Sequence, residues 1–129
     1  MQPSRGVVLK VRNPGITRHM DALDENALTY ILTRAHDIIL GGTDDASTEV
    51  DVPSAVAREI YERCARVEPR LPPEFEVDVG FRPLRDRVRL EREPGTRIIH
   101  NYGHGGAGFT VSWGCAREVL RLVQRVSGR

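Results

Sequence analysis

Apolar residues between Pro53 and Pro69 recur with the period of an α-helix. The spacings are four, four and three positions, in the order Val56, Ile60, Cys64 and Val67. These spacings align side chains on one helical face, and proline is common just outside a helix but rare within it. The pattern predicts an amphipathic helix of about 14 residues that buries one face.

The first forty residues favour β-strands instead. Residues 6–11 are rich in apolar side chains, and residues 27–33 and 37–40 form two similar runs around Arg34-Ala35. Gly41-Gly42 closes the second of these runs. We therefore predict one strand followed by a β-hairpin. The charged segment between them, residues 18–26, is predicted to be an exposed loop or lid.

Two further strands and a helix are predicted in the second half of the chain. Residues 75–81 and 87–91 alternate apolar with charged or small residues, as strands with one exposed face do, and Pro94-Gly95 predicts a turn. Ser112 suits an N-cap. A helical stripe of apolar residues follows it: Trp113, Ala116, Val119, Leu120, Val123 and Val126. This order of strands and helices indicates an α+β fold.

Composition places the chain among ordinary globular proteins. Its 129 residues suffice for one domain or part of one, with 40% hydrophobic and 29% charged residues. A net charge of +1 gives no basic surface for nucleic acid or a membrane. Without a membrane span or an apolar signal segment, a cytoplasmic location is predicted. Cys64 and Cys115 are expected to be small buried residues and not disulfide or metal ligands.

Residues 100–111 place four glycines between an apolar strand and the last helix. Gly103, Gly105 and Gly108 have the spacing of the dinucleotide-binding fingerprint, in which the backbone approaches a pyrophosphate. That fingerprint opens a βαβ unit and precedes an acidic residue by about 20 positions, where this chain has Gly128. The loop therefore indicates contact with a ligand, but not a pyrophosphate site by itself.

A few side chains are candidates for binding chemistry. Arg82 precedes Pro83, which favours extended backbone, and its guanidinium either binds a carboxylate or phosphate or remains a surface charge. Tyr30 either orients a polar ligand or fills the core. His100 and His104 have metal-pair spacing only on a helix, so we predict no metal site in a strand and loop. The absence of a nucleophile motif or carboxylate pair disfavours a hydrolase.

Read in order, several blocks of this sequence closely resemble the C-terminal part of D-amino-acid oxidases. The blocks are Leu28-Thr-Tyr30, Ile39-Leu40-Gly41-Gly42-Thr43, Gly80-Phe-Arg82-Pro83-Leu-Arg85, Arg89-Leu-Glu-Arg-Glu93, His100-Asn-Tyr-Gly-His-Gly-Gly-Ala-Gly-Phe-Thr110 and Trp113-Gly-Cys-Ala116. Residues 6–13 are similar to the strand that enters the family's substrate-binding sheet. The resemblance therefore extends from Leu28 to the C-terminus and is weaker before it.

The resemblance implies an FAD enzyme that oxidises a D-amino acid by hydride transfer to the flavin. Dioxygen then reoxidises the flavin and gives hydrogen peroxide, and hydrolysis of the imino acid releases a 2-oxo acid and ammonia. By the same resemblance, Arg82 and Tyr30 bind the substrate carboxylate, the Gly106 carbonyl accepts the substrate amine, and no side chain acts as acid or base. The resemblance also implies that the positive N-terminal end of the helix near Trp113 points to the flavin ring. The implied flavin contacts are Gly105, Gly106, Ala107, Gly108, Phe109 and Thr110.

The sequence departs from this family in two places. Some relatives carry a second active-site tyrosine four residues before Tyr30, where this chain has Asn26. The family's FAD pyrophosphate fingerprint has no counterpart before Gly6. We therefore expect a C-terminal fragment, with residues 1–91 from the substrate-binding domain. Residues 92–129 would be the last strand, glycine loop and C-terminal helix of an FAD-binding α/β domain whose N-terminal half is absent.

Three alternatives stay open on the same residues. The chain belongs to a related glycine or D-aspartate oxidase, or it is a non-catalytic, truncated remnant that cannot bind FAD alone. The expected partners are a D-amino acid, dioxygen, and either a second copy in a homodimer or the missing N-terminal half. A remnant would leave the apolar face of the last helix exposed.

Overall fold

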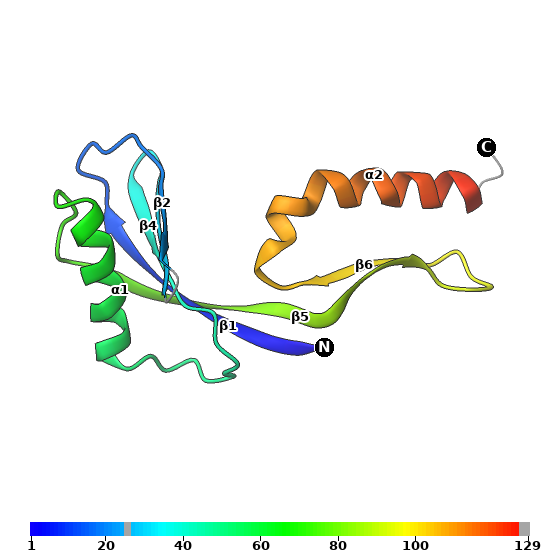
Figure 1. Cartoon of the computed structure of the whole chain (residues 1–129), viewed down its shortest axis with the longest axis horizontal. Coiled ribbons are helices and arrows are strands. Elements are labelled where there is room, and N and C mark those ends of the chain that lie inside the picture. The colour runs from blue at the N-terminus through cyan, green and yellow to red at the C-terminus, as the bar shows by residue number, and fades with distance from the viewer. Residues whose placement is uncertain (25–26, 127–129) are drawn as a thin grey trace. The chain divides into compact units, whose positions relative to one another are not determined.

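The computed structural model describes residues 1–24 and 27–126. Its elements are β1 (Gln2–Arg12), β2 (Met20–Asp24), β3 (Ala27–Thr33), β4 (Asp37–Gly41), α1 (Ser54–Val67), β5 (Glu76–Arg92), β6 (Ile99–His104), the 3-10 helix η1 (Gly105–Ala107) and α2 (Gly108–Val126) (Figure 1). The strand order is β2-β3-β4-β1-β5-β6. The pairs β1/β4, β2/β3, β3/β4 and β5/β6 are antiparallel. The chain divides into two compact units, residues 5–81 and residues 1–4 with 82–129.

The unit of residues 5–81 packs helix α1 on a face of the antiparallel strands (Figure 1). The predicted hairpin of β3 and β4 is confirmed, with Thr33 paired to Ile38 and the Arg34 amide donating to the Asp37 carbonyl at 2.8 Å. The predicted helix is confirmed as well, since α1 contains 14 residues and begins directly after Pro53. Periodicity sufficed here because both elements depend on residues close together in the sequence.

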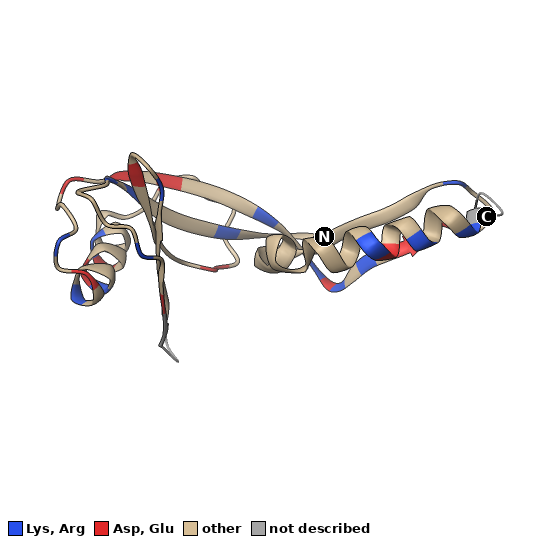
Figure 2. Ribbon diagram, turned by 90° about the horizontal axis from the view of Figure 1, so that it is seen from above, with Lys and Arg blue, Asp and Glu red and all other residues tan. Residues whose placement is uncertain are grey.

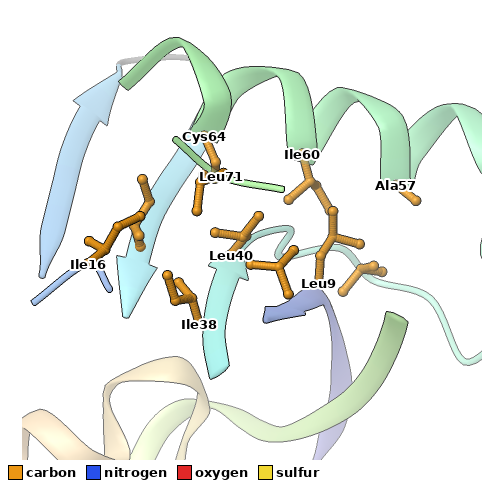
Figure 3. Close-up of a cluster of buried hydrophobic side chains, with 11 residues drawn as sticks. Leu9, Ile16, Ile38, Leu40, Ala57, Ile60, Cys64 and Leu71 are labelled. Carbon is orange, nitrogen blue, oxygen red and sulfur yellow. The ribbon is translucent and has the colours of Figure 1, made fainter. Parts of the chain in front are cut away.

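The hydrophobic core of this unit lies between α1 and the strands (Figure 3). Ile60 and Cys64 of α1 face Leu9 of β1 and both Ile38 and Leu40 of β4, and all five side chains are fully buried. Burial of one such aliphatic side chain contributes about 1.5–3 kcal/mol. The core therefore fixes α1 against the ends of β3 and β4.

One part of the predicted loop at residues 18–26 is a strand. Met20–Asp24 forms β2 and pairs with β3, with Met20 opposite Ile31. Met20 also packs against the core. Pairing with β3 supplies the backbone hydrogen bonds that the charged composition did not predict. Asn26, where some oxidases carry a second tyrosine, lies outside the described residues.

The two strands predicted at residues 75–81 and 87–91 are one continuous strand, β5, of 17 residues. Pro83 does not interrupt it, because the extended geometry that a proline imposes on Arg82 is also strand geometry. The register against β6 shifts between Leu84 and Arg89, so the irregularity falls just after the proline. The predicted turn is confirmed at Gly95, which has a φ of 76°.

Helix α2 begins at Gly108, earlier than the predicted N-cap at Ser112. It runs beside β6, and its first charged residue is Arg117, so its N-terminal turns are uncharged (Figure 2). Trp113 is 88% exposed, and Leu120 and Val123 are also exposed. Part of the apolar stripe of α2 is therefore accessible. No helix in the described part of the chain is long and apolar enough to cross a bilayer.

The observed antiparallel sheet with two helices agrees with the α+β prediction. The assignment of residues 1–91 to substrate binding and of residues 92–129 to cofactor binding stays a prediction, because compactness does not report what a unit binds.

Candidate functional site

Arg82 and Gly106 lie together in the unit that contains residues 82–129. Arg82 stands in β5 and Gly106 in η1. A Cβ atom built on Gly106 would lie 3.4 Å from Arg82 Cδ and 3.5 Å from Arg82 Nε, which is contact distance. Gly106 is exposed, whereas Arg82 is half-buried. The fold thus sets a guanidinium beside an accessible stretch of backbone.

Two other glycines explain how the loop approaches β5 so closely. Gly103 and Gly105 have φ angles of 90° and 55°, in the left-handed region that favours glycine. A Cβ on Gly103 would lie 2.6 Å from Arg85 Cδ, and one on Gly105 would lie 2.8 Å from Leu84 Cδ1. Side chains of β5 already fill this space. Gly103 and Gly105 therefore serve the turn and its contact with β5.

Side chains on β6, the strand that enters the glycine turn, contact both α2 and β5. Cys115 Sγ of α2 lies 3.3 Å from His104 Nε2, which joins the end of β6 to the helix. Arg89 Nη1 donates a 3.2 Å hydrogen bond to the Tyr102 hydroxyl, and the Arg85 guanidinium lies 5.3 Å from the centre of the Tyr102 ring. Sequence reasoning missed these contacts. The row of arginines alternating along β5 was a signal for the contacts of Tyr102, but not for the contact between His104 and Cys115.

The segment predicted to contact flavin contains the N-terminal end of α2. Gly105, Gly106 and Ala107 form η1, while Gly108, Phe109 and Thr110 open α2. Phe109 is 93% exposed. The first turn of α2 carries no acidic residue, so the positive end of the helix dipole is not neutralised there. This arrangement can hold a flat ligand that carries or develops negative charge.

Tyr30 lies in β3, in the unit of residues 5–81, and pairs with Gly41 of β4. A Cβ on Gly41 would overlap the Tyr30 ring, and a Cβ on Gly42 would lie 3.1 Å from the Tyr30 hydroxyl oxygen. The ring therefore rests on the two glycines. The ring leaves no room for a Cβ on Gly41, and at Gly42 a Cβ would also lie 2.9 Å from the Val7 carbonyl oxygen. The joint action of Tyr30 with Arg82 stays a prediction.

The two histidines near the loop have different partners. His100 Nε2 lies 2.9 Å from Glu93 Oε2, and His104 contacts Cys115. The described residues include no group of three or more histidine, cysteine or acidic side chains that could hold a metal ion.

Both cysteines are buried and free, as predicted. Burial raises the pKa of the Cys64 thiol to about 11, although the charge of Arg63 and a hydrogen bond to Gly41 oppose the rise. The Cys64 thiol is therefore protonated at neutral pH and can donate a hydrogen bond.

Comparison with known proteins agrees with these features. The family model DAO, described as FAD dependent oxidoreductase, matches residues 1–122. The D-amino-acid oxidase of Rubrobacter xylanophilus is 47% identical over 93% of this chain and 39% of its own length. The D-aspartate oxidase of Homo sapiens is 39% identical over 94% of this chain and 38% of its own length. The chain thus spans about two fifths of these curated relatives.

A solved structure shows the same fold. Glycine oxidase from Bacillus cereus ATCC 14579 matches with a TM-score of 0.75 and 18% sequence identity, over 95% of this chain and 36% of that chain. At this identity the match carries information on the fold alone.

Proposed function

Because this chain belongs to the family of FAD-dependent oxidoreductases, we propose that it forms the substrate-binding part and one flavin-contacting segment of a D-amino-acid oxidase. The 47% identity to a D-amino-acid oxidase over nearly the whole chain supports this choice. The observation that carries the proposal is the proximity of Arg82 to Gly106, because it brings the implied carboxylate ligand next to the implied amine ligand.

The residues of the glycine loop fit the cofactor that the family name implies. FAD would lie against Gly105, Gly106, Ala107, Gly108, Phe109 and Thr110. Gly106 bears no side chain and is exposed, so a ring system can approach its backbone closely. The 3-10 helix η1 leads directly into α2 at Gly108, so the positive N-terminal end of the helix lies in this segment. When bound, FAD supplies the two-electron acceptor for the oxidation.

The chain's own residues bind and orient the substrate in this proposal. Arg82 forms two charge-assisted hydrogen bonds to the carboxylate, and the Tyr30 hydroxyl donates a third. The Gly106 carbonyl accepts a hydrogen bond from the amine. A substrate fixed at both its carboxylate and its amine presents its α-carbon in one orientation. The proposal gives no side chain a proton to transfer.

The overall reaction takes a D-amino acid, dioxygen and water to a 2-oxo acid, ammonia and hydrogen peroxide. The N-terminal end of α2 favours negative charge that develops beside it, and its uncharged first turns leave this effect intact. Because α2 starts at Gly108, this end coincides with the glycine loop itself. In this proposal the positive end of α2 and the glycine loop therefore both face the bound flavin.

A hybrid enzyme tests the proposal. In this hybrid, residues 1–129 replace the matching segment of the Rubrobacter xylanophilus D-amino-acid oxidase. We expect a yellow protein with the visible spectrum of bound flavin that releases hydrogen peroxide from D-alanine and none from L-alanine. A yellow hybrid that oxidises no D-amino acid would contradict the substrate assignment, and a colourless hybrid would contradict the flavin contacts. The unaltered relative is the control.

D-Aspartate oxidation is a second candidate, because a D-aspartate oxidase is 39% identical to this chain. An acidic substrate needs a second cation for its side-chain carboxylate. Comparing D-alanine with D-aspartate in the same hybrid separates these activities. If the D-amino-acid oxidase proposal holds, kcat/KM of the hybrid will be larger for D-alanine than for D-aspartate.

A non-catalytic role for the isolated chain is a third candidate. The exposed apolar side chains of α2, including Phe109 and Trp113, support it, because exposed apolar surface of this kind favours association with a partner. The visible spectrum of the purified chain after addition of FAD is the test. Retained flavin after gel filtration excludes this role, and a colourless protein supports it.

A further inference from the structure

Helix α1 presents two consecutive residues, Arg63 and Cys64, to the strand ends that carry Tyr30. Arg63 Nη2 donates hydrogen bonds to the Gly42 carbonyl at 3.2 Å and to the Leu28 carbonyl at 3.5 Å. Cys64 Sγ lies 3.7 Å from the Tyr30 carbonyl and 3.9 Å from the Gly41 carbonyl. Two neighbouring residues of α1 therefore contact four carbonyls around one point of the hairpin.

This point is where the Tyr30 ring is held. Tyr30 and Gly41 are register partners in β3 and β4, and the Gly42 amide donates to the Leu28 carbonyl at 2.8 Å. The Tyr30 ring rests on Gly41 and Gly42, since a Cβ on Gly41 would overlap it. A shift of the β4 end would therefore move the support of the ring.

Burying the side chain of Arg63 at this position costs free energy. Its side chain is 10% exposed, and within the described residues its Nε atom is buried without a hydrogen-bond partner. Glu59 balances its charge through a 2.6 Å ion pair. A buried cation with an unsatisfied donor costs free energy that an apolar side chain would not cost. Stability alone does not explain an arginine here, whereas its hydrogen bonds to two carbonyls do.

Cys64 contributes from inside the core. Figure 3 shows its side chain pointing from α1 into the buried cluster with Leu40 and Leu71. The thiol stays protonated because burial raises its pKa to about 11. It is therefore a donor toward the Tyr30 and Gly41 carbonyls at every physiological pH.

We propose that Arg63 and Cys64 are positioning residues, which fix the location of the Tyr30 hydroxyl by holding the carbonyls of the β3 and β4 ends from helix α1. This inference rests on the substrate-binding role proposed for Tyr30. The inference extends that role to helix α1, which carries none of the proposed substrate or flavin contacts and acts through Tyr30.

The test uses the complete chain with ring-labelled tyrosine and NMR spectroscopy. Arg63→Met removes the donors, and Arg58→Met is the matched control, because Arg58 is an exposed arginine on the same helix. We expect Arg63→Met to shift the Tyr30 ring signals and the Gly41 and Gly42 amide signals. The signals of Tyr61 and Tyr102 should stay as they are in Arg58→Met.

Arg63→Lys tests whether the positive charge of Arg63 suffices to position Tyr30 or whether the several donors of its guanidinium are required. Lysine keeps the charge but offers a single donor group, so we expect signals between those of the unchanged chain and those of Arg63→Met. If Arg63→Met does not fold, Arg63→Lys alone decides. Tyr30 signals that stay unchanged in every folded Arg63 variant would overturn the proposal.

Kinetics of the hybrid enzyme test whether the position of Tyr30 affects substrate binding. We expect Arg63→Met to raise KM for D-alanine about tenfold, with kcat changed less than about twofold, since a carboxylate ligand is displaced. Shifted Tyr30 signals with an unchanged KM would overturn the positioning role while leaving oxidase activity intact. An inert hybrid without any substitution would instead refute the proposed function, so the two failures are distinguishable.

Discussion

The side chain of Arg82 lies beside Gly106, because a Cβ built on Gly106 would be 3.4 Å from Arg82 Cδ, so a strand and a glycine turn come together at one arginine. A Cβ on Gly106 would touch Arg82 at ordinary contact distance, and the backbone of Gly106 is accessible from outside. A cation and an exposed peptide group side by side suit an amino acid, which carries a carboxylate next to an amine.

Replacing Arg82 by alanine tests the cation directly. We expect Arg82→Ala in the hybrid enzyme to raise KM for D-alanine about 10-fold to 100-fold, because a forked, charge-assisted pair is lost. Peroxide release at varied D-alanine concentration measures this effect. Arg97→Ala is the control, since Arg97 is an exposed arginine of the same unit. Equal KM values for the two variants would contradict the role of Arg82.

A single methyl group at Gly106 tests the contact itself. The new Cβ would lie 3.4 Å from Arg82 Cδ, at ordinary contact distance, so the methyl group fits without displacing the arginine but occupies the space beside it. We expect Gly106→Ala to raise KM about threefold to tenfold with little change in the free energy of unfolding. Gly80→Ala is the control, because no heavy atom lies within 4 Å of its Cβ. A KM that rises equally in both variants would point to a general disturbance of β5.

The pH dependence of stability should depend on Glu68. Hydrogen bonds from Arg70 lower the pKa of Glu68 from 4.5 to about 2, against the smaller opposing effect of burial. The charged carboxylate therefore stabilises the fold fully above pH 4.5, and this contribution is lost as the pH falls toward 2. We expect Glu68→Gln to flatten the fall in the free energy of unfolding between pH 4.5 and 2.

Urea unfolding followed by circular dichroism at several pH values measures this change. Glu62→Gln, an exposed glutamate of α1, serves as the control. The two variants should differ most at neutral pH and converge near pH 2. A constant difference between them at all pH values would show that Glu68 acts without its charge.

The thiol of Cys64 reports on opening of the unit of residues 5–81. Its pKa near 11 leaves about one molecule in a thousand as thiolate at pH 8, and its side chain is fully buried. In a Cys115→Ser variant, where Cys64 is the remaining thiol, labelling by a disulfide reagent should be slow in buffer and fast in urea. Fast labelling in buffer would contradict the close contact between α1 and the β3–β4 hairpin.

The same raised pKa predicts a loss of stability in alkali. The folded state favours the protonated thiol, so its advantage is complete below pH 9 and disappears as the pH rises toward 11. Replacing Cys64 by alanine should remove this alkaline dependence, at the cost of a cavity in the core.

Parts of the fold were predictable because they depend on neighbours in the sequence. Helix α1 follows from four apolar residues at helical spacing between two prolines, and its bounds agree with the prediction. The β3–β4 hairpin follows from two β-rich runs around a short connection. The start of α2 was missed by five residues, because Gly108 joined the helix although glycine lowers helix propensity.

Other parts depended on partners that lie far away in the sequence. Residues 20–24 were predicted to lie in a charged loop, but they form a strand because they pair with the edge of β3. Arg63 appeared only as one charged residue on a helix, and its contacts with Leu28 and Gly42 required the hairpin to be in place. Periodicity carries no information on such long-range pairs.

The sequence by itself determined the local elements, the glycine loop and membership of an oxidase family, because these depend on short spacings and on residue identity. Only the tertiary structure decided that Arg82 meets Gly106 and that α1 supports the strand ends beneath Tyr30. Both relationships arise when separate elements pack together, and the packing of side chains between elements is not encoded in any one segment.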